Sequence, residues 1–312
     1  MKTIDIVVPC YNEQEVLPTF VKETNEVIDT IKDYKFRYIF VNDGSKDNTL
    51  PILKNLASQQ DNIKYISFSR NFGKESAMYA GLKNTSADYV IVMDADLQHP
   101  PKMFPQMIAG IEEGFECCAL YRAKQTGESK LRQLVSKIFF SFQNNISDVK
   151  MPDGAVDYRI MSRKMVDAIM ELSEVQRFSK GIFCWVGFKT KWIEYQNVER
   201  TLGTTKWSMF SLFKYALDGI TSFSVAPLRF IAVMGFVISI LSFIYILITL
   251  IQTLFFGIDV HGYVTTLCAT LFLGGIIELS VGVLGEYIGR IYIETKRRPI
   301  YICSETNIED EE

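Results

Sequence analysis

Short apolar runs alternate with longer amphipathic segments over the first 121 residues. Near-continuous apolar runs suit strands buried on both faces of a sheet. We predict such strands at Ile4–Pro9, Phe36–Val41, Ile63–Phe68, Tyr89–Met93 and Cys117–Tyr121. We predict helices between them at Glu13–Ile31, Asp47–Ser58, Glu75–Asn84 and Pro101–Glu112. This alternation predicts an α/β fold, with a parallel sheet covered by helices on both faces.

Two long apolar segments stand near the end of the chain. Phe230–Phe256 contains no charged residue, and as a helix it would span ~40 Å at ~1.5 Å per residue, enough for one tilted crossing of a ~30 Å hydrocarbon core. The second segment, from Tyr263 to about Ile288, is interrupted by Glu278 and Glu286. A buried helical hairpin of a soluble protein is the alternative. Lysines and arginines flank the pair and are absent from the link Gly257–Gly262, which predicts that both ends are cytoplasmic.

These patterns predict three parts of the chain. Residues 1–227 form a cytoplasmic α/β domain, residues 228–290 a transmembrane hairpin, and residues 291–312 a cytoplasmic tail. Residues 122–160 are less regular, and the basic, amphipathic stretch around Leu131–Phe142 is interpreted as a helix at the membrane interface, or else as a solvated helix face. We therefore expect a multi-pass protein of the inner (plasma) membrane.

Charge and cysteine content narrow the class of protein. The net charge of −3 argues against general affinity for nucleic acid. The six cysteines have no paired spacing and are interpreted as reduced thiols in the cytosol. Because the amino terminus leads directly into a strand pattern, we expect no signal peptide.

Polar clusters follow four of the predicted strands. They are Pro9–Glu13, Asn42–Ser45, Ser69–Lys74 and Asp94–Gln98. Each cluster alone is compatible with an ordinary turn or helix cap. Parallel sheets bind ligands at the carboxyl ends of their strands, so four clusters at one edge favour a nucleotide site.

Asp94 and Asp96 are the strongest candidates for chemistry. Two carboxylates one residue apart at a strand end can share a divalent cation, and hard oxygen ligands favour Mg²⁺ or Mn²⁺. Such a cation would neutralise the diphosphate that leaves when a sugar nucleotide reacts. The neighbouring His99 is interpreted as a solvent-facing histidine rather than a metal ligand.

The polar clusters and the acidic pair make the chain resemble glycosyltransferase family 2. The resemblance rests on Val7–Glu13, Asn42–Ser45 and Asp94–Gln98. Further blocks are similar to the polyprenyl-phosphate glycosyltransferases of the bactoprenol glucosyltransferase type: Ser69–Glu75, Val156–Arg163, Lys180–Gly187, Gly219–Ser224 and Leu284–Arg290. Dolichol-phosphate mannose synthase resembles the first half of the chain.

The resemblance implies a GT-A fold and a UDP-sugar donor. By position, the residues that would hold the uridine and its ribose are Pro9, Tyr11, Glu13 and Asp43. Asp94 would face the sugar and the diphosphate, Asp96 would be the main metal ligand, and Gln98 would support either. Arg70 and Lys74 would reach phosphates, unless they are only surface charges.

A lipid phosphate acceptor needs cationic partners more than a strong base, because its second pKa of ~6 leaves it largely dianionic near neutral pH. The candidate cations are Arg122, Arg132, Arg200 and Lys206. Asp157 could act as a weak base or orient a substrate, or it could form an ion pair with Arg159 or Arg163 that only fixes the loop.

The resulting hypothesis is a hexosyltransferase. It would transfer one hexose, glucose first and N-acetylglucosamine next, from a UDP-sugar to undecaprenyl phosphate at the cytoplasmic face of the membrane. A homo-oligomer and a flippase partner are further expectations. The alternatives are a processive polysaccharide synthase and an inactive scaffold or partner of a lipid-sugar flippase.

Overall fold

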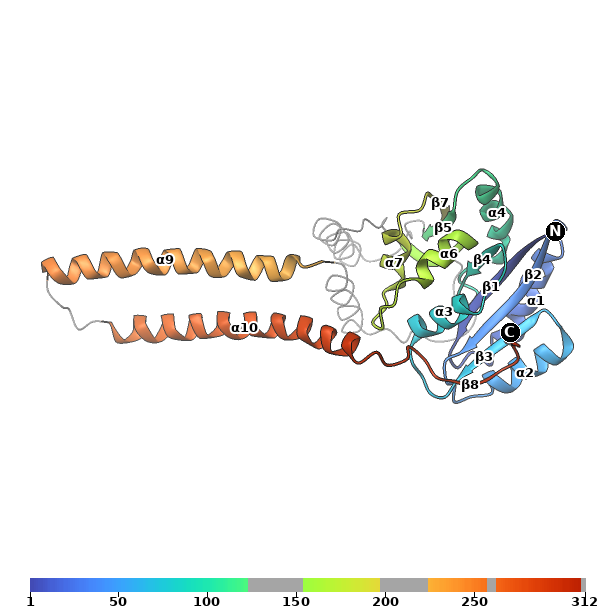
Figure 1. Ribbon diagram of the computed structural model, residues 1–312, viewed down its shortest axis with the longest axis horizontal. Coiled ribbons are helices and arrows are strands. Elements are labelled where there is room, and N and C mark those ends of the chain that lie inside the picture. The colour runs from blue at the N-terminus through green and yellow to red at the C-terminus, as the bar shows by residue number, and fades with distance from the viewer. Residues whose placement is uncertain (123–153, 197–223, 257–261, 310–312) are drawn as a thin grey trace.

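The computed structural model describes residues 1–122, 154–196, 224–256 and 262–309. The expected interface stretch Leu131–Phe142 lies outside the described residues. An eight-stranded sheet forms the centre of the α/β domain, in the order β7-β5-β6-β4-β1-β2-β3-β8 (Figure 1). Its strands are β1 Lys2–Cys10, β2 Tyr34–Asn42, β3 Ile63–Phe68, β4 Tyr89–Val92, β5 Cys117–Arg122, β6 Ala155–Ser162, β7 Thr190–Tyr195 and β8 Cys303–Thr306.

Strands β1 to β4 are mutually parallel wherever they pair, and β5 pairs in parallel with β7. Strand β6 runs antiparallel between β4 and β5, and β8 runs antiparallel at the edge next to β3. The predicted mostly parallel α/β sheet is confirmed. The sequence did not predict β6, β7 or β8, of which β8 lies within the segment expected to be a tail.

Helices cover both faces of the sheet, as predicted. Alternate residues of β1 point to opposite faces, since Ile6 and Val8 belong to one buried cluster and Val7 to the other. The first face is covered by α1 (Leu17–Ile28), α2 (Thr49–Gln59) and α4 (Phe104–Glu112), which follows the short helix η1 (Pro101–Met103). The second is covered by α3 (Lys74–Lys83), α6 (Arg163–Met170) and α7 (Ser179–Trp185).

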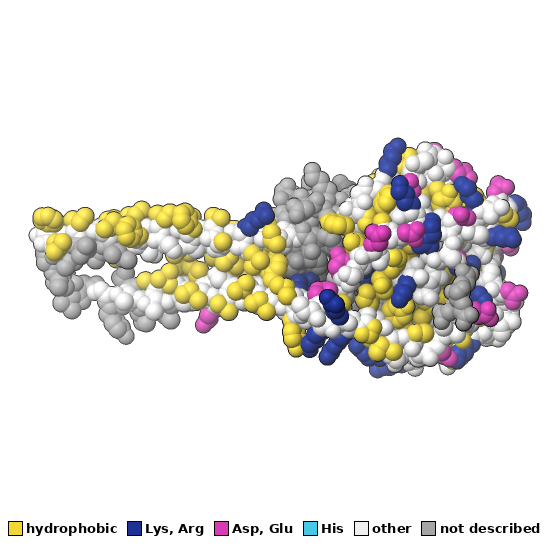
Figure 2. All heavy atoms as spheres, viewed as in Figure 1, with side chains coloured by type: hydrophobic (Ala, Val, Ile, Leu, Met, Phe, Trp, Pro, Cys, Tyr) yellow, Lys and Arg dark blue, Asp and Glu magenta, His cyan; other side chains and the backbone are white. Residues whose placement is uncertain are grey.

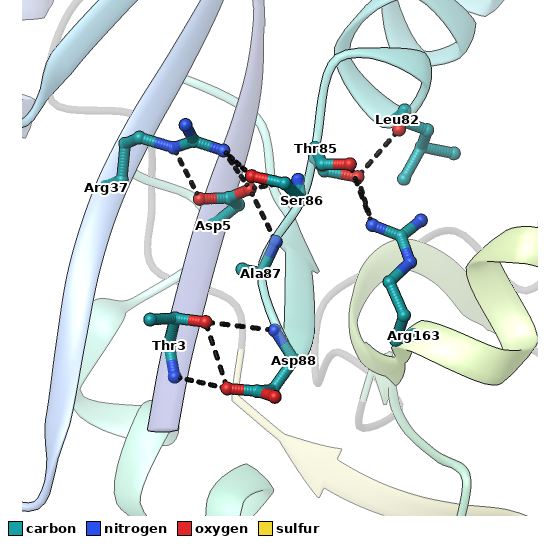
Figure 3. Close-up of polar contacts among 9 residues, drawn as sticks. All are labelled: Thr3, Asp5, Arg37, Leu82, Thr85, Ser86, Ala87, Asp88 and Arg163. Carbon is teal, nitrogen blue, oxygen red and sulfur yellow. Dashed lines mark hydrogen bonds and ion pairs between the residues drawn. The ribbon is translucent and has the colours of Figure 1, made fainter. Parts of the chain in front are cut away.

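A polar network fixes the amino ends of the central strands (Figure 3). The guanidinium of Arg37 on β2 donates from Nε and Nη2 to both carboxylate oxygens of Asp5 on β1, at 2.8 and 2.7 Å. Asp5 Oδ2 also accepts from the backbone N–H groups of Ser86 and Ala87, just before β4. The buried carboxylate therefore joins three strands at the edge opposite the four polar clusters.

Two long helices leave the α/β domain side by side (Figure 1). They are α9 (Ala226–Phe256) and α10 (Tyr263–Thr295), and their apolar side chains are largely exposed (Figure 2). Ala226–Tyr245 and Phe272–Thr295 are long and apolar enough to cross a membrane. The Tyr287 hydroxyl of α10 donates to the Ser224 carbonyl at 2.7 Å, which joins the two helices near the domain.

Candidate active site

The loops after β1 and β2 are tied together at the carboxyl edge of the sheet. Asn12 has a left-handed backbone, with φ of 55°, and its N–H donates to Ser45 Oγ at 2.9 Å. The Asn12 carboxamide oxygen accepts from the Lys46 N–H at 2.9 Å. Pro9 lies at the end of β1, and the loop after it carries Tyr11 and Glu13, so the structure brings these predicted residues to the same edge as Asp43.

Asp43 connects the end of β2 to the loop before α3. Its carboxylate is almost fully buried and accepts from the Phe72 N–H at 2.6 Å and the Gly73 N–H at 3.0 Å. Burial raises the pKa of Asp43, and these two amides oppose that rise. Both carboxylate oxygens of Asp43 therefore hold the loop before α3 in place. The role of Asp43 in binding uridine stays a prediction.

Gly44 is required by this close approach of two loops. Its φ is +62°, and a Cβ there would lie 2.3 Å from the carbonyl carbon of Arg70. Arg70 itself stacks on Phe72, with its guanidinium 3.9 Å from the ring centre, and donates to the Asn71 carbonyl at 2.8 Å. Its predicted contact with phosphate stays a prediction.

Lys74, the first residue of α3, bridges two carboxylates. Its Nζ lies 2.6 Å from Asp94 Oδ1 and 2.8 Å from Asp157 Oδ2. Burial disfavours the ammonium, but the two carboxylates outweigh that cost and raise the pKa of Lys74 well above its usual value. Burial likewise opposes ionisation of Asp94 and Asp157, yet the neighbouring Lys74 lowers the pKa of both. All three groups are therefore charged at neutral pH.

Asp157 lies on β6 and is 9% exposed. The structure shows that its ionic partner is Lys74, so the alternative of an ion pair with Arg159 or Arg163 is wrong. Arg159 donates to the carbonyls of Asp157 and Val156, and Arg163 pairs with Asp167. Asp157 Oδ1 is buried and has no hydrogen-bond partner among the described residues, so this carboxylate keeps one acceptor that Lys74 does not use.

Glu75 is a site neighbour that the sequence reasoning missed. One oxygen of its carboxylate accepts from both the N–H and the hydroxyl of Ser179, the first residue of α7. Burial, together with the negative charge of Asp157, raises the pKa of Glu75 to about 7. A Lys-Glu pair at the start of a helix gives no sequence signal for such a contact, because Ser179 is distant in the chain.

Asp96 and Gln98 form a tight turn after β4. The Gln98 N–H donates to Asp96 Oδ1 at 3.1 Å, and Leu97 between them has φ of 58°. Arg122, at the end of β5, reaches this turn, with Nη2 3.5 Å from Gln98 Oε1. Arg122 therefore lies next to the turn that follows β4, whereas Arg132, Arg200 and Lys206 lie outside the described residues.

His99 is buried, so the expectation of a solvent-facing histidine is wrong. Its ring stacks on Tyr158, with 5.0 Å between ring centres. Its Nδ1 accepts from the Asp94 N–H at 3.2 Å, and burial lowers its pKa. A neutral ring with Nδ1 as acceptor positions Asp94 through the backbone and is not available there as a metal ligand.

The turn that carries Asp94, Asp96 and Gln98 is suited to a cation that also binds a phosphate ligand. Within the described ranges, no three His, Cys, Asp or Glu side chains gather closely enough to form a complete metal cage. Asp94 and Asp96 supply carboxylates and Gln98 a carboxamide oxygen. Mg²⁺ is commonly held by one or two carboxylates, with phosphate oxygens and water completing its shell. The donor set therefore suits Mg²⁺ or Mn²⁺ bound together with a diphosphate.

Comparison with known sequences and structures identifies what this arrangement is similar to. Residues 5–170 match the profile of Glycosyl transferase family 2, and residues 226–291 match that of the GtrB C-terminal hairpin. CsbB of Bacillus subtilis is 47% identical over 305 residues, covering 98% of this chain and 92% of that protein. The bactoprenol glucosyl transferase of Shigella phage SfX is 42% identical over 299 residues, covering 96% of this chain and 98% of that protein.

A solved structure that aligns with part of this chain is glucosyl-3-phosphoglycerate synthase from Mycobacterium tuberculosis. It is 17% identical, has a TM-score of 0.48, and the alignment covers 70% of this chain and 76% of that chain.

Proposed function

This chain belongs to glycosyltransferase family 2, with a GT-A type sheet, and from that premise we propose that it transfers one glucose from UDP-glucose to undecaprenyl phosphate. The observation that carries the proposal is the extent of the similarity to bactoprenol glucosyl transferases. The match to the phage SfX protein covers 96% of this chain, so it includes the hairpin as well as the α/β domain.

The proposed reaction joins two anions. A phosphate oxygen of the lipid attacks the anomeric carbon of glucose, the bond from that carbon to the UDP oxygen breaks, and UDP leaves with the bonding electrons. A dianionic phosphate is already a nucleophile, so the enzyme has little need of a strong base. This suits Asp157, whose pKa is lowered and whose carboxylate pairs with Lys74. We assign Asp157 to orientation rather than to proton removal.

The negative charge of the leaving diphosphate would be neutralised by a cation at the turn Asp94–Gln98 and by neighbouring residues. Asp96 and Asp94 would hold Mg²⁺ or Mn²⁺, which when bound acts as a Lewis acid on the diphosphate. Arg122 lies beside Gln98 and would add positive charge at the same place. The loops that carry Pro9, Tyr11, Glu13 and Asp43 would receive the uridine, and Arg70 borders them.

The hairpin would anchor this site at the membrane. The chain is membrane-associated on the strength of its two apolar helices and its bactoprenol-linked relatives. We propose that α9 and α10 both cross the bilayer with the α/β domain in the cytoplasm. The charged residues at the base of the hairpin support this orientation. A homo-oligomer and a flippase partner stay predictions from the sequence.

The test is a transfer assay with purified protein in lipid nanodiscs. UDP-glucose and UDP-N-acetylglucosamine are supplied separately with undecaprenyl phosphate and Mg²⁺ or Mn²⁺, and the lipid product is identified by mass. We expect a single added glucose, no product in EDTA, and a loss of at least about 100-fold in turnover for Asp96→Ala. Asp61→Ala, which removes an exposed carboxylate far from the turn in sequence, is the matched control.

Each part of the proposal would be contradicted by a different result. A polymer on the lipid would favour a processive synthase, and an N-acetylhexosamine product would overturn the choice of glucose. Full turnover in EDTA, or in Asp96→Ala, would overturn the metal assignment. UDP release that does not depend on undecaprenyl phosphate would overturn the acceptor.

A further inference from the structure

A cavity of about 520 Å³ lies where the loop between α6 and α7 meets the last turns of α10. Its apolar wall includes Phe178, Ile182 and Ile291, and its polar wall includes Gln176 and Arg297. Helix α7 lies between this cavity and the site formed by Lys74, Asp94 and Asp157. Ser179 at its start contacts Glu75 next to Lys74, whereas Phe178 and Ile182 line the cavity.

The loop is fastened to α10 by one carboxylate. Glu294 Oε1 and Oε2 accept from the Val175 N–H at 3.1 and 3.0 Å, and Oε1 also accepts from the Gln176 N–H at 3.0 Å. Charged acceptors make the stronger class of hydrogen bond. The loop and α10, which together line the cavity, are therefore joined by specific hydrogen bonds and do not merely lie next to each other.

The cavity offers positive charge from Arg290 and Arg297. Arg290 Nε lies 3.4 Å from Glu286 Oε1, and Arg297 has no ion-pair partner among the described residues. Arg297 also has φ of 48° just after the end of α10, a position where glycine is the usual residue. An arginine in this left-handed conformation costs free energy that a glycine would avoid. We therefore infer that its side chain has a role. Two guanidinium groups that line one cavity suit a phosphate.

The same cavity offers two buried acceptors. Glu174 Oε2 and Gln176 Oε1 are buried, and neither has a hydrogen-bond partner in the part of the chain that the structure describes. Arg177 Nη1 is 4.0 Å from Glu174 Oε2, which is too long for a hydrogen bond. Buried acceptors are normally paired, so these two oxygens can accept from a donor that the described residues do not supply. A carboxylate among them favours a cationic donor such as an ammonium.

The cavity also lies at the depth of lipid headgroups if α10 crosses the bilayer as proposed above. Phe272–Thr295 is the candidate membrane span of α10, and the cavity is lined by Tyr287, Arg290 and Glu294 near its carboxyl end. Basic pockets at the cytoplasmic ends of transmembrane helices bind phospholipid headgroups. The apolar wall would meet the glycerol and the first methylenes of the chains.

We propose that this cavity binds the headgroup of a membrane phospholipid that carries a primary amine, as in phosphatidylethanolamine. The phosphate faces Arg290 and Arg297, and the ammonium donates to Glu174 and Gln176. The inference rests on the membrane placement in the proposed function, but it assigns a site separate from the one that handles the sugar donor.

The test measures lipid retained by the full-length protein. The protein is equilibrated in nanodiscs of equal parts phosphatidylethanolamine, phosphatidylglycerol and phosphatidylcholine, extracted in mild detergent, and analysed by native mass spectrometry. We expect selective retention of phosphatidylethanolamine, because phosphatidylcholine lacks an N–H donor and phosphatidylglycerol lacks the cation. Arg297→Gly removes the side chain in a backbone conformation that glycine adopts readily, so it should fold.

Removing one guanidinium should lower retention by about fivefold, since a hydrogen bond to the phosphate contributes ~1 kcal/mol. Arg298→Gly, one residue further and outside the cavity lining, loses the same charge and should change retention less than about twofold. Gln176→Leu should also lower retention, because it removes an acceptor while keeping the bulk.

Equal retention of the three headgroups, or equal behaviour of Arg297→Gly and Arg298→Gly, would overturn the proposal. A further arm adds undecaprenyl phosphate to the nanodiscs. If that lipid alone were retained through Arg297, the cavity would belong to the acceptor and the proposal would also be overturned. Retention needs no turnover, so an enzyme that failed to use UDP-glucose would still report on the cavity.

Discussion

Lys74 Nζ lies 2.6 Å from Asp94 Oδ1, so an ammonium already occupies one oxygen of the acidic pair that the sequence suggested for a metal. The same nitrogen lies 2.8 Å from Asp157 Oδ2. One cation therefore offsets two carboxylates that come from different strands. In the proposed reaction, Lys74 keeps Asp94 and Asp157 ionised and close together before the substrates bring their own charges.

Replacing Lys74 should impair turnover through these two carboxylates. In Lys74→Met, Asp94 and Asp157 lose their shared ammonium, so their pKa values should rise and their positions should separate. We expect a fall of about 100-fold in kcat for glucosyl transfer, the scale of losing one preorganised charged group. Lys83→Met removes an exposed lysine from the other end of α3 and should retain activity. Comparable rates for the two variants would contradict the role given to Lys74.

Glu75 should make stability depend on pH. Its pKa is about 7 in the folded protein, against an ordinary value of 4.5. Between these values the unfolded carboxyl ionises while the folded one stays protonated, so stability present below pH 4.5 is lost as the pH rises to about 7. Glu75→Gln can still accept from Ser179 and has no such cost.

We therefore expect Glu75→Gln to gain stability relative to the native protein as the pH rises from about 5 to about 8, by about 2 kcal/mol. Thermal unfolding in detergent across this range measures the difference. Glu26→Gln, which alters an exposed residue of α1, should follow the native curve. Parallel curves for native protein and Glu75→Gln would show that Glu75 is not protonated in the fold.

Gly44→Ala should disrupt the loops at the carboxyl edge of the sheet, where the uridine is proposed to bind. The effect should exceed the strain of placing alanine in a left-handed backbone. The new methyl group would lie 2.3 Å from the backbone of Arg70, so one of the two loops must move. Gly114 has φ of +89° with nothing within 4 Å of a Cβ, which makes Gly114→Ala a control for backbone strain alone. We expect Gly114→Ala to cost about 1 kcal/mol of stability and to keep its KM for UDP-glucose. Gly44→Ala should raise that KM, and equal KM values would contradict the proposed crowding.

Asp5→Ala should test the polar network at the opposite edge of the sheet (Figure 3). The Asp5 carboxylate is 2% exposed and serves Arg37 and two backbone amides, so its loss should cost about 3 kcal/mol. Asp167 pairs with Arg163 but is 63% exposed, and Asp167→Ala should cost less than about 0.5 kcal/mol. Unfolding midpoints measure both. Similar midpoints would show that the buried pair contributes no more than the exposed one.

The sequence predicted the first half of the fold well because each element carries its own local pattern. The predicted Ile63–Phe68 coincides with β3, and the other early strands differ from prediction only at their ends. Strands β6, β7 and β8 were missed, since their pairing partners are remote in the chain. Antiparallel β6 in particular is placed by its neighbours β4 and β5 rather than by its own pattern.

The same distinction applies to the candidate site. The strand-end clusters predicted that Asp43, Lys74 and Asp94 would share one edge, because sheet topology alone brings them there. Their partners were not predictable. That Lys74 faces Asp157, and that Glu75 faces Ser179, depends on how β6 and α7 pack against α3. The burial of His99 between Asp94 and Tyr158 depends on packing in the same way.

Strand β8 has a consequence for how the protein is made. It pairs with β3, yet it is synthesised only after both helices of the hairpin. If α9 and α10 cross the membrane as proposed, β3 stays an exposed sheet edge until the ribosome releases β8, in a nascent chain whose helices are already entering the bilayer. Exposed edges invite pairing with other chains. On the proposed topology, membrane insertion precedes closure of the sheet, and a delay in insertion prolongs the interval in which the nascent enzyme can aggregate.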